Sequence, residues 1–243
     1  LLRPAAGGAA GRAEPPARGA AEVVRAGAAE PGLIVLGLSD GRLYPVAVST
    51  EVTYADGKRA IRPAATGGSP VTIDASGRPV GPFSYVRSPD GPIAAAATGA
   101  REVTLLRVVE KTSMAGESTR EESRSVVPLS AKGEITALAL DGRGQDLFAG
   151  TSAGEIVRID LRDESAPKQQ ETRTTRGAVT VLGFVNGDRT LVSGDASGAV
   201  ASWQVVQAEN GASRSLELIQ TFGAHSATVT GFSPSRHNKG FVT

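Results

Sequence analysis

The chain has 243 residues, of which 40% are hydrophobic but only 4% aromatic, so its core must be mainly aliphatic. Its formal net charge of +1 argues against a strongly basic nucleic-acid surface. The absence of cysteine excludes disulfides and thiolate metal sites, and no apolar run approaches the roughly 18 residues of a transmembrane helix.

Two parts of the chain differ in composition. Residues 1–30 are rich in Ala, Gly, Pro and Arg without a sustained hydrophobic period, which predicts a flexible leader. From Gly32 onward, short apolar runs are broken by Gly, Asp, Ser and Pro about every ten residues, which predicts many short antiparallel strands. Residues 31–243 are therefore expected to form one all-β domain.

Two hairpins are predicted in the first half of this domain. Asp56-Gly57 is a typical two-residue hairpin turn, between apolar residues at 52–54 and 60–61. A second hairpin joins residues 93–97 to residues 103–109, and the mixed charges of residues 118–124 predict an exposed loop.

An internal repeat of 44 residues dominates the second half. Residues 135–140 (ITALAL) align without a gap on residues 179–184 (VTVLGF), and the same offset relates the residues that follow them. The further pairs are Leu147 with Leu191, Gly150 with Gly194, Gly154 with Gly198, Ile156 with Val200, and Ile159 with Trp203. A period of about 40–45 residues is typical of a four-stranded propeller blade.

Partial copies of the repeat flank this pair. Residues 33–43 repeat the middle of a blade, and residues 229–234 match its first strand. We therefore predict a β-propeller of about five to seven four-stranded blades. The chain begins without an initiator Met and ends at Thr243 within an expected strand, so we expect a longer protein whose last blade is cut short.

The motifs that resemble catalytic signatures fit the repeat better than they fit catalysis. Residues 150–154 and 37–41 both match G-x-S-x-G, the nucleophile elbow of α/β-hydrolases, which would make Ser152 and Ser39 the candidate nucleophiles. That elbow requires a helix after the serine, whereas residues 155–159 predict a strand. The repeat also places Ala196 at the position of Ser152, so a recurring turn is favoured and no catalytic residue is assigned.

Other candidate site residues have simpler interpretations. His225 and His237 are the only histidines, too few for a triad or a zinc site, and His225 precedes a first strand, where propellers often place a structural histidine. Lys58, Arg59 and Arg62 could meet an anion but fit a solvated hairpin flank. Trp203 is expected in the core, and the S-x-x-K match at residues 165–168 lies in a polar linker. No phosphate-binding loop occurs. We predict no cofactor, no metal site and no enzymatic activity.

The repeats resemble degenerate WD40 units. Ile159-Asp160 and Trp203-Gln204 stand where that family has Trp-Asp. A closer resemblance is to the large insert of the permease subunit of phosphate ABC importers (PstC type). It is carried by residues 37–41, 51–63, 111–117 and 236–241, in the order of that family.

This second resemblance implies a propeller facing the periplasm from the bacterial inner membrane, whose membrane helices lie outside this chain. The implied partners are a second permease subunit and a periplasmic phosphate-binding protein, contacted through docking or gating. Two alternatives remain open: a soluble WD40-like scaffold that binds proteins, and, from the G-x-S-x-G matches alone, a hydrolase.

Overall fold

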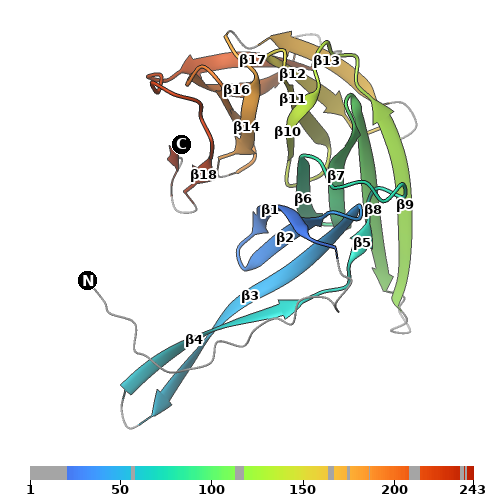
Figure 1. Ribbon diagram of the computed structural model, residues 1–243, viewed down its shortest axis with the longest axis vertical. Coiled ribbons are helices and arrows are strands. Elements are labelled where there is room, and N and C mark those ends of the chain that lie inside the picture. Colours follow the sequence, from blue (N-terminus) through green and yellow to red (C-terminus); the bar gives the residue numbers. More distant parts are fainter. Residues whose placement is uncertain are drawn as a thin grey trace. The chain divides into compact units, whose positions relative to one another are not determined.

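The computed structural model describes residues 21–55, 58–112, 118–163, 167–173, 176–185, 187–207, 214–235, 238 and 240–243. These residues form 19 β-strands and no helix, and every paired strand is antiparallel (Figure 1). The chain divides into two compact units, Leu1–Pro79 and Val80–Thr243, rather than forming the single domain expected from residue 31.

The first unit is built on one sheet, sheet 1. Its main strands follow chain order: β1 (Val23–Glu30), β2 (Leu33–Leu38), β3 (Arg42–Ala55) and β4 (Lys58–Gly67), while β5 (Val71–Thr72) pairs with the start of β3. The end of the predicted leader is therefore wrong, because β1 pairs with β2 along most of its length. This Ala-rich segment forms a strand because its backbone hydrogen-bonds to β2, although its side chains show no hydrophobic alternation. Residues 1–20 lie outside the described residues.

The hairpin predicted around Asp56-Gly57 is confirmed by the register of its strands. Ala55 pairs with Lys58, Val52 with Ile61 and Val46 with Gly67, which leaves residues 56 and 57 as the connection. The pairing of β2 with β3 reaches only to Ala47. Beyond Val48, β3 has β4 as its only partner strand among the described residues.

The second unit contains four sheets, each a simple meander. Sheet 2 has β6 (Phe83–Ser88), β7 (Gly91–Gly99), β8 (Glu102–Thr112) and β9 (Ser118–Pro128). Sheet 3 has β10 (Ile135–Leu140), β11 (Asp146–Thr151), β12 (Glu155–Asp160) and β13 (Lys168–Arg173). Sheet 4 has β14 (Val179–Phe184), β15 (Thr190–Asp195), β16 (Val200–Gln207) and β17 (Arg214–Thr221), and sheet 5 pairs β18 (Ser233–Pro234) with β19 (Phe241–Val242).

The 44-residue repeat is confirmed at the level of single hydrogen-bonded pairs. In sheet 3 Phe148 pairs with Arg158. In sheet 4 the residues 44 positions later, Val192 and Ser202, pair with each other in the same way. The irregularity at the start of β10 also recurs at the start of β14. The all-β, propeller-type fold predicted from this period is therefore correct.

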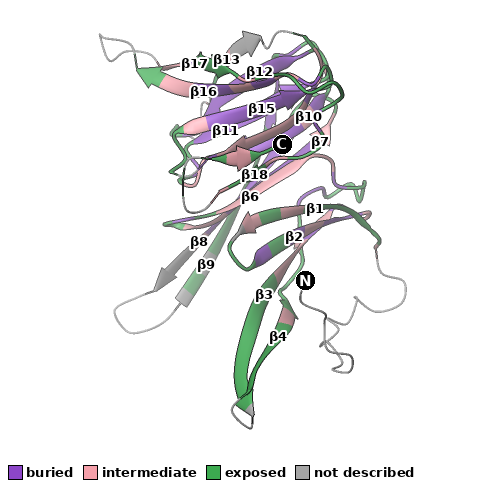
Figure 2. Ribbon diagram, turned by 90° about the vertical axis from the view of Figure 1, so that its left-hand side faces the viewer, coloured by how far each residue is buried: buried purple, intermediate pink, exposed green. Residues whose placement is uncertain are grey.

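Sheet 3 is buried on both sides. All six residues of β11 and of β12 are buried, as the central colouring of Figure 2 shows. One side, including Leu138, Leu147 and Ile159, packs on sheet 2. The other side, including Phe148 and Ile156, packs on sheet 4. Alternation along each strand thus divides the apolar residues between two neighbouring sheets.

Hydroxyl groups on the first strands join neighbouring sheets. The Thr136 hydroxyl donates to the backbone oxygen of Val179 at 2.5 Å, and the Thr180 hydroxyl donates to that of Val229 at the same distance. Between sheets 2 and 3, the backbone N–H of Leu140 donates to the Ser84 hydroxyl at 3.0 Å. Each described junction in the second unit therefore has at least one hydrogen bond that involves a short polar side chain.

One further sequence expectation is wrong. Residues 118–124, expected to be an exposed loop, belong to β9, which pairs with β8 along its whole length. Because β9 is the last strand of its sheet, its outer edge needs no apolar covering. Its charged side chains are compatible with a strand for that reason.

Candidate functional site

Both G-x-S-x-G matches are turns between two strands. Residues 150–154 span the end of β11 and its turn to β12, and residues 37–41 span the end of β2 and its turn to β3, so a strand follows each serine where the hydrolase elbow requires a helix. Gly154 has a φ of 78° and Gly41 a φ of 80°, which explains the second glycine of each motif. Gly150 lies so close to Val179 of sheet 4 that a Cβ would stand 2.7 Å from the Val179 Cβ.

The two serines have the same structural role. The backbone N–H of Glu134 donates to the Ser152 hydroxyl at 3.0 Å, and that of Glu22 donates to the Ser39 hydroxyl at 2.9 Å. Each serine N–H also donates back to the backbone oxygen of the same glutamate. Ala196, at the third copy of the turn, keeps only the backbone bond, to Ala178. The hydroxyl is therefore an optional anchor for the start of the sheet.

Polar groups in sheet 4 and beside sheet 5 are hydrogen-bonded. The Trp203 indole N–H donates to the Ser193 hydroxyl at 2.8 Å, and Trp203 is buried, as predicted. The ring of His225 is hydrogen-bonded to the Thr243 hydroxyl at 2.8 Å. Registers of β15 and β19 place Thr243 at the position of Ser193. The structural interpretation of His225 is therefore supported, whereas His237 lies outside the described residues.

A buried ion trio lies on the side of sheet 3 that faces sheet 4. The Arg158 guanidinium, 4% exposed, contacts Asp146 at 2.5 Å and Asp160 at 3.3 Å. Arg214 of β17 lies 3.4 Å from Asp146, and a hydrogen bond from Arg162 holds the pKa of Asp160 below its usual range. The Arg158 Nε has no hydrogen-bond partner in the described structure. This trio was missed from the sequence.

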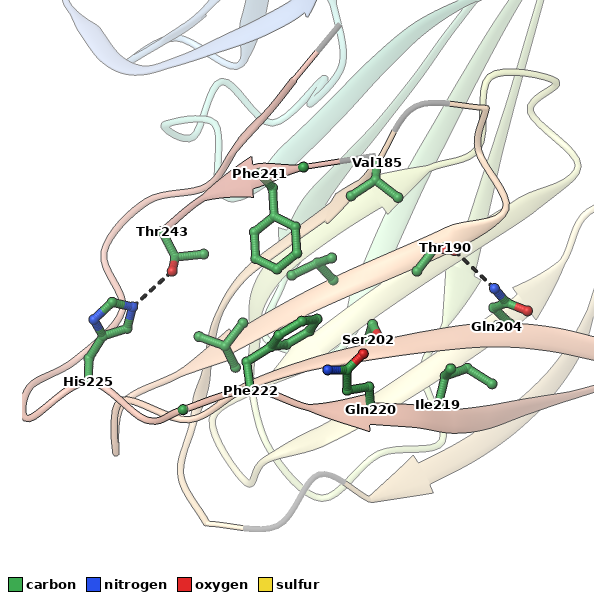
Figure 3. A pocket seen from close by; sticks show the side chains of 14 residues that line it. Val185, Thr190, Ser202, Gln204, Ile219, Gln220, Phe222, His225, Phe241 and Thr243 are labelled. Atoms are coloured by element: carbon green, nitrogen blue, oxygen red, sulfur yellow. Dashed lines mark hydrogen bonds between the residues drawn. The ribbon is translucent and has the colours of Figure 1, made fainter. Parts of the chain in front are cut away.

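Sheet 4 has a neutral trio at the equivalent positions, and a pocket opens there. Thr190, Ser202 and Gln204 stand 44 residues after the three ionic groups, and the Gln204 amide donates to Thr190 at 3.1 Å. They line a pocket of about 560 Å³ together with Phe222, Phe241 and others (Figure 3). The short Ser202 side chain leaves free the space that a guanidinium fills in sheet 3.

The chemistry of this pocket is that of a binding surface. Among the described residues that line it, His225 is the only titratable side chain, and its ring is already bonded to Thr243. The remaining lining combines aliphatic and aromatic side chains with neutral amides and hydroxyls. No group of three or more metal-ligating side chains exists among the described residues. The arrangement can receive an apolar or amide-bearing group but offers no general acid or base pair.

The basic residues predicted as a hairpin flank lie on β4 and divide between its two faces. Residues directly opposite in an antiparallel pair share a face. One face, here called the apolar face, is therefore formed by alternating residues of β3 and β4: Val48, Thr50, Val52, Tyr54, Arg59, Ile61, Pro63 and Ala65. The opposite face carries Ser49, Glu51, Thr53, Lys58, Ala60 and Arg62.

The other residues singled out from the sequence do not join a common site. Lys168 opens β13, paired with Asp160, while residues 165 and 166 lie outside the described structure. Most of residues 111–117 and Arg236 are also outside it. No described helix is long and apolar enough to cross a membrane.

Comparison with known proteins shows the fold. No protein-family model and no curated protein matches the chain. A chain of the mitotic checkpoint complex superposes with a TM-score of 0.55 at 16% identity, covering 91% of this chain and 56% of that one. Sqt1 from Chaetomium thermophilum, solved bound to the N-terminus of the ribosomal protein L10, gives 0.50 at 15% identity, covering 83% of this chain and 50% of that one. The chain spans about half the length of these WD40 propellers, and it shares their fold.

Proposed function

We propose that the chain is a protein-interaction platform built on WD40-like sheets, without catalytic activity of its own. The observation that carries this proposal is the amphipathic β3–β4 hairpin, whose apolar face is uncovered although the strands that bear it are regularly paired. Scaffold proteins bind through exposed apolar patches of this kind.

The structural roles of the candidate catalytic groups support the same function. Ser39, Ser152 and His225 each make hydrogen bonds that fix a turn or a sheet junction. The pocket of Figure 3 adds an apolar surface with neutral polar groups. Sqt1, which shares the fold, was solved bound to a peptide segment of another protein.

The proposal is tested by cross-linking mass spectrometry on the tagged full-length protein in its native cells. We expect reproducible cross-links from the exposed Lys58 to one other protein, and no labelling of Ser152 by a fluorophosphonate. Cross-links confined to the chain itself, or stoichiometric labelling of Ser152, would contradict the proposal.

A second, more specific function is proposed from the sequence motifs: the extracytoplasmic propeller of a phosphate importer permease. Of the residues that carry this resemblance, 37–41 span the end of β2 and the β2–β3 turn, and 58–63 lie in β4, both in the first unit. Co-purification with a second permease subunit and a periplasmic phosphate-binding protein is the expected result, with no saturable phosphate binding by the chain itself. A gene that encodes no apolar 20-residue segment beside this region would exclude the proposal.

A further inference from the structure

The β3–β4 hairpin extends beyond the rest of sheet 1. Apart from its pairing with β4, the last described hydrogen bond of β3 within the sheet is the one from the Val48 N–H to the Gly32 oxygen. From Val48 to Ala55 the strand rises about 23 Å at about 3.3 Å per residue. Along this stretch the described residues of β3 from Val48 to Tyr54 are exposed, and so are residues 58–63 of β4, whereas Ala64 and Ala65 are half-buried, as the colouring of Figure 2 shows.

The apolar face becomes more exposed toward the tip. Val48 is 37% exposed and Val52 42%, whereas Ile61 is 55% and Tyr54 73% exposed. At the base the same face is covered, because the Tyr44 ring lies against Gly67. A two-stranded ribbon is marginally stable in water, and a cover on its apolar face would stabilise it.

The edge of β4 is unsuited to pairing with another strand. Pro63 has no N–H to donate, and Lys58, Arg59 and Arg62 would meet like charges in a second copy paired edge to edge. The edge of β4 therefore disfavours an added strand, and because the exposed apolar side chains lie on the face, we place the partner there. A two-stranded face is about 10 Å wide with its side chains, close to the diameter of an α-helix.

Charge selects the end of the partner that lies at the tip. Arg59 is opposite Tyr54 on the apolar face and has no ion pair with a described residue. A carboxylate on the partner would pair with this guanidinium, and carboxylates are favoured in the first turn of a helix. From Val48 to Tyr54 the face is about 20 Å long, which corresponds to about 13 helical residues.

We propose that the apolar face binds an amphipathic helix of a partner protein, about 13 residues long, with an acidic first turn placed over Arg59. This inference rests on the proposed function and names its partner class. A bilayer fits less well, because the tip sequence Asp56-Gly57-Lys58 is polar and would have to enter it first.

The test uses the whole chain and a stapled 14-residue helical peptide with leucines along one side and two glutamates in its first turn. Binding is followed by fluorescence anisotropy. We expect the pair Val52→Thr and Ile61→Thr, which keeps β-branched side chains, to weaken binding at least tenfold. Arg59→Glu should do the same, whereas Lys58→Glu, with an identical charge change on the other face, should stay within twofold.

A peptide with two lysines in the first turn completes the design. Arg59→Glu should bind it at least tenfold better than the unmodified protein does. Equal losses for Arg59→Glu and Lys58→Glu would overturn the inference, and so would a concentration-dependent dimer that Val52→Thr/Ile61→Thr abolishes. Binding to vesicles of phosphatidylcholine and phosphatidylserine that requires Tyr54 would also overturn it. Cross-links from other surfaces would leave the platform function standing.

Discussion

The buried ion trio of sheet 3 allows a quantitative test, because sheet 4 has neutral groups at the same three positions. Replacing Arg158 by Ser leaves two carboxylates, 8% and 11% exposed, without the cation between them. Breaking a buried ion pair from one side costs about 3–5 kcal/mol. Asp146 keeps Arg214 and Asp160 keeps Arg162, so we expect the lower end, about 3 kcal/mol.

Transplanting the whole neutral trio should cost less. The triple variant D146T/R158S/D160Q removes both carboxylates together with the guanidinium, so no uncompensated charge stays buried. What remains is the void left by the guanidinium, about 1–2 kcal/mol. The triple variant should therefore be more stable than R158S by about 1 kcal/mol or more, despite two further substitutions.

Urea unfolding followed by the fluorescence of Trp203 measures these differences, because Trp203 is the only tryptophan and is buried against sheet 3. Arg162→Ser is the matched control. It makes the same change at a half-exposed cation beside Asp160 and should cost less than about 1 kcal/mol. A cost for R158S no larger than that of R162S, or a triple variant less stable than R158S, would refute the reasoning, provided that the m-values agree.

Three further outcomes are expected. Ser152→Ala should cost about 0.5–1 kcal/mol in urea unfolding, because it removes one exposed hydrogen bond from Glu134; a loss above 3 kcal/mol would contradict the turn role. Asp141→Asn should leave the free energy of unfolding at pH 7 unchanged or raise it, because burial raises the pKa of Asp141 and the ionised carboxylate therefore destabilises the folded state. This gain in stability should vanish below the pKa of an unfolded aspartate, about 4. Destabilisation at pH 7 would be the contrary result. The hydrogen bond from Arg162 lowers the pKa of Asp160, so the ionised Asp160 stabilises the fold fully above about pH 4, and this stabilisation is lost as the pH falls below that value. In thermal melts between about pH 4 and pH 2, Arg162→Ser should therefore lose less stability with falling pH than the unmodified protein does. An equal loss in both proteins would count against it.

The part of the fold predicted from the sequence is the part that is buried on both sides. In sheets 3 and 4 each strand position has the same neighbours, so Leu147 and Leu191, or Gly150 and Gly194, meet the same packing demands. The 44-residue repeat in the sequence follows from this equivalence of packing positions in the two sheets. The β3–β4 hairpin was also predictable, because an Asp-Gly pair between two strand-like segments is a strong local signal.

The strands that were missed lie at the first or last position of a sheet. β1 and β9 are held by backbone hydrogen bonds to one neighbour, and their side chains need not alternate. Backbone pairing places no demand on side-chain type, so composition alone predicted a leader and a loop there. Residue type therefore predicts a strand less well at the edge of a sheet than in its centre.

The serine turns and the ion trio show the same limit at the level of single residues. The repeat indicated that Ser152 is a turn residue, but its bond to Glu134 depends on how β10 and β11 are joined. Arg158 interrupts an apolar strand, which was a visible signal. Its partners, however, come from β11 and the end of β12, and only the register brings them together.

The hydroxyl bonds at the sheet junctions have a consequence for how the second unit comes apart. Ser84 and Thr136 each join one sheet to the next, and Thr180 joins sheet 4 to the segment that leads into sheet 5, so these parts form a linear series of nearest-neighbour couplings. In such a series a substitution at one junction acts first on the two segments that it joins. Amide hydrogen exchange should be slow in sheet 3, which is buried on both sides, and Thr180→Val should speed exchange around Val229 while leaving the protection of sheet 2 unchanged.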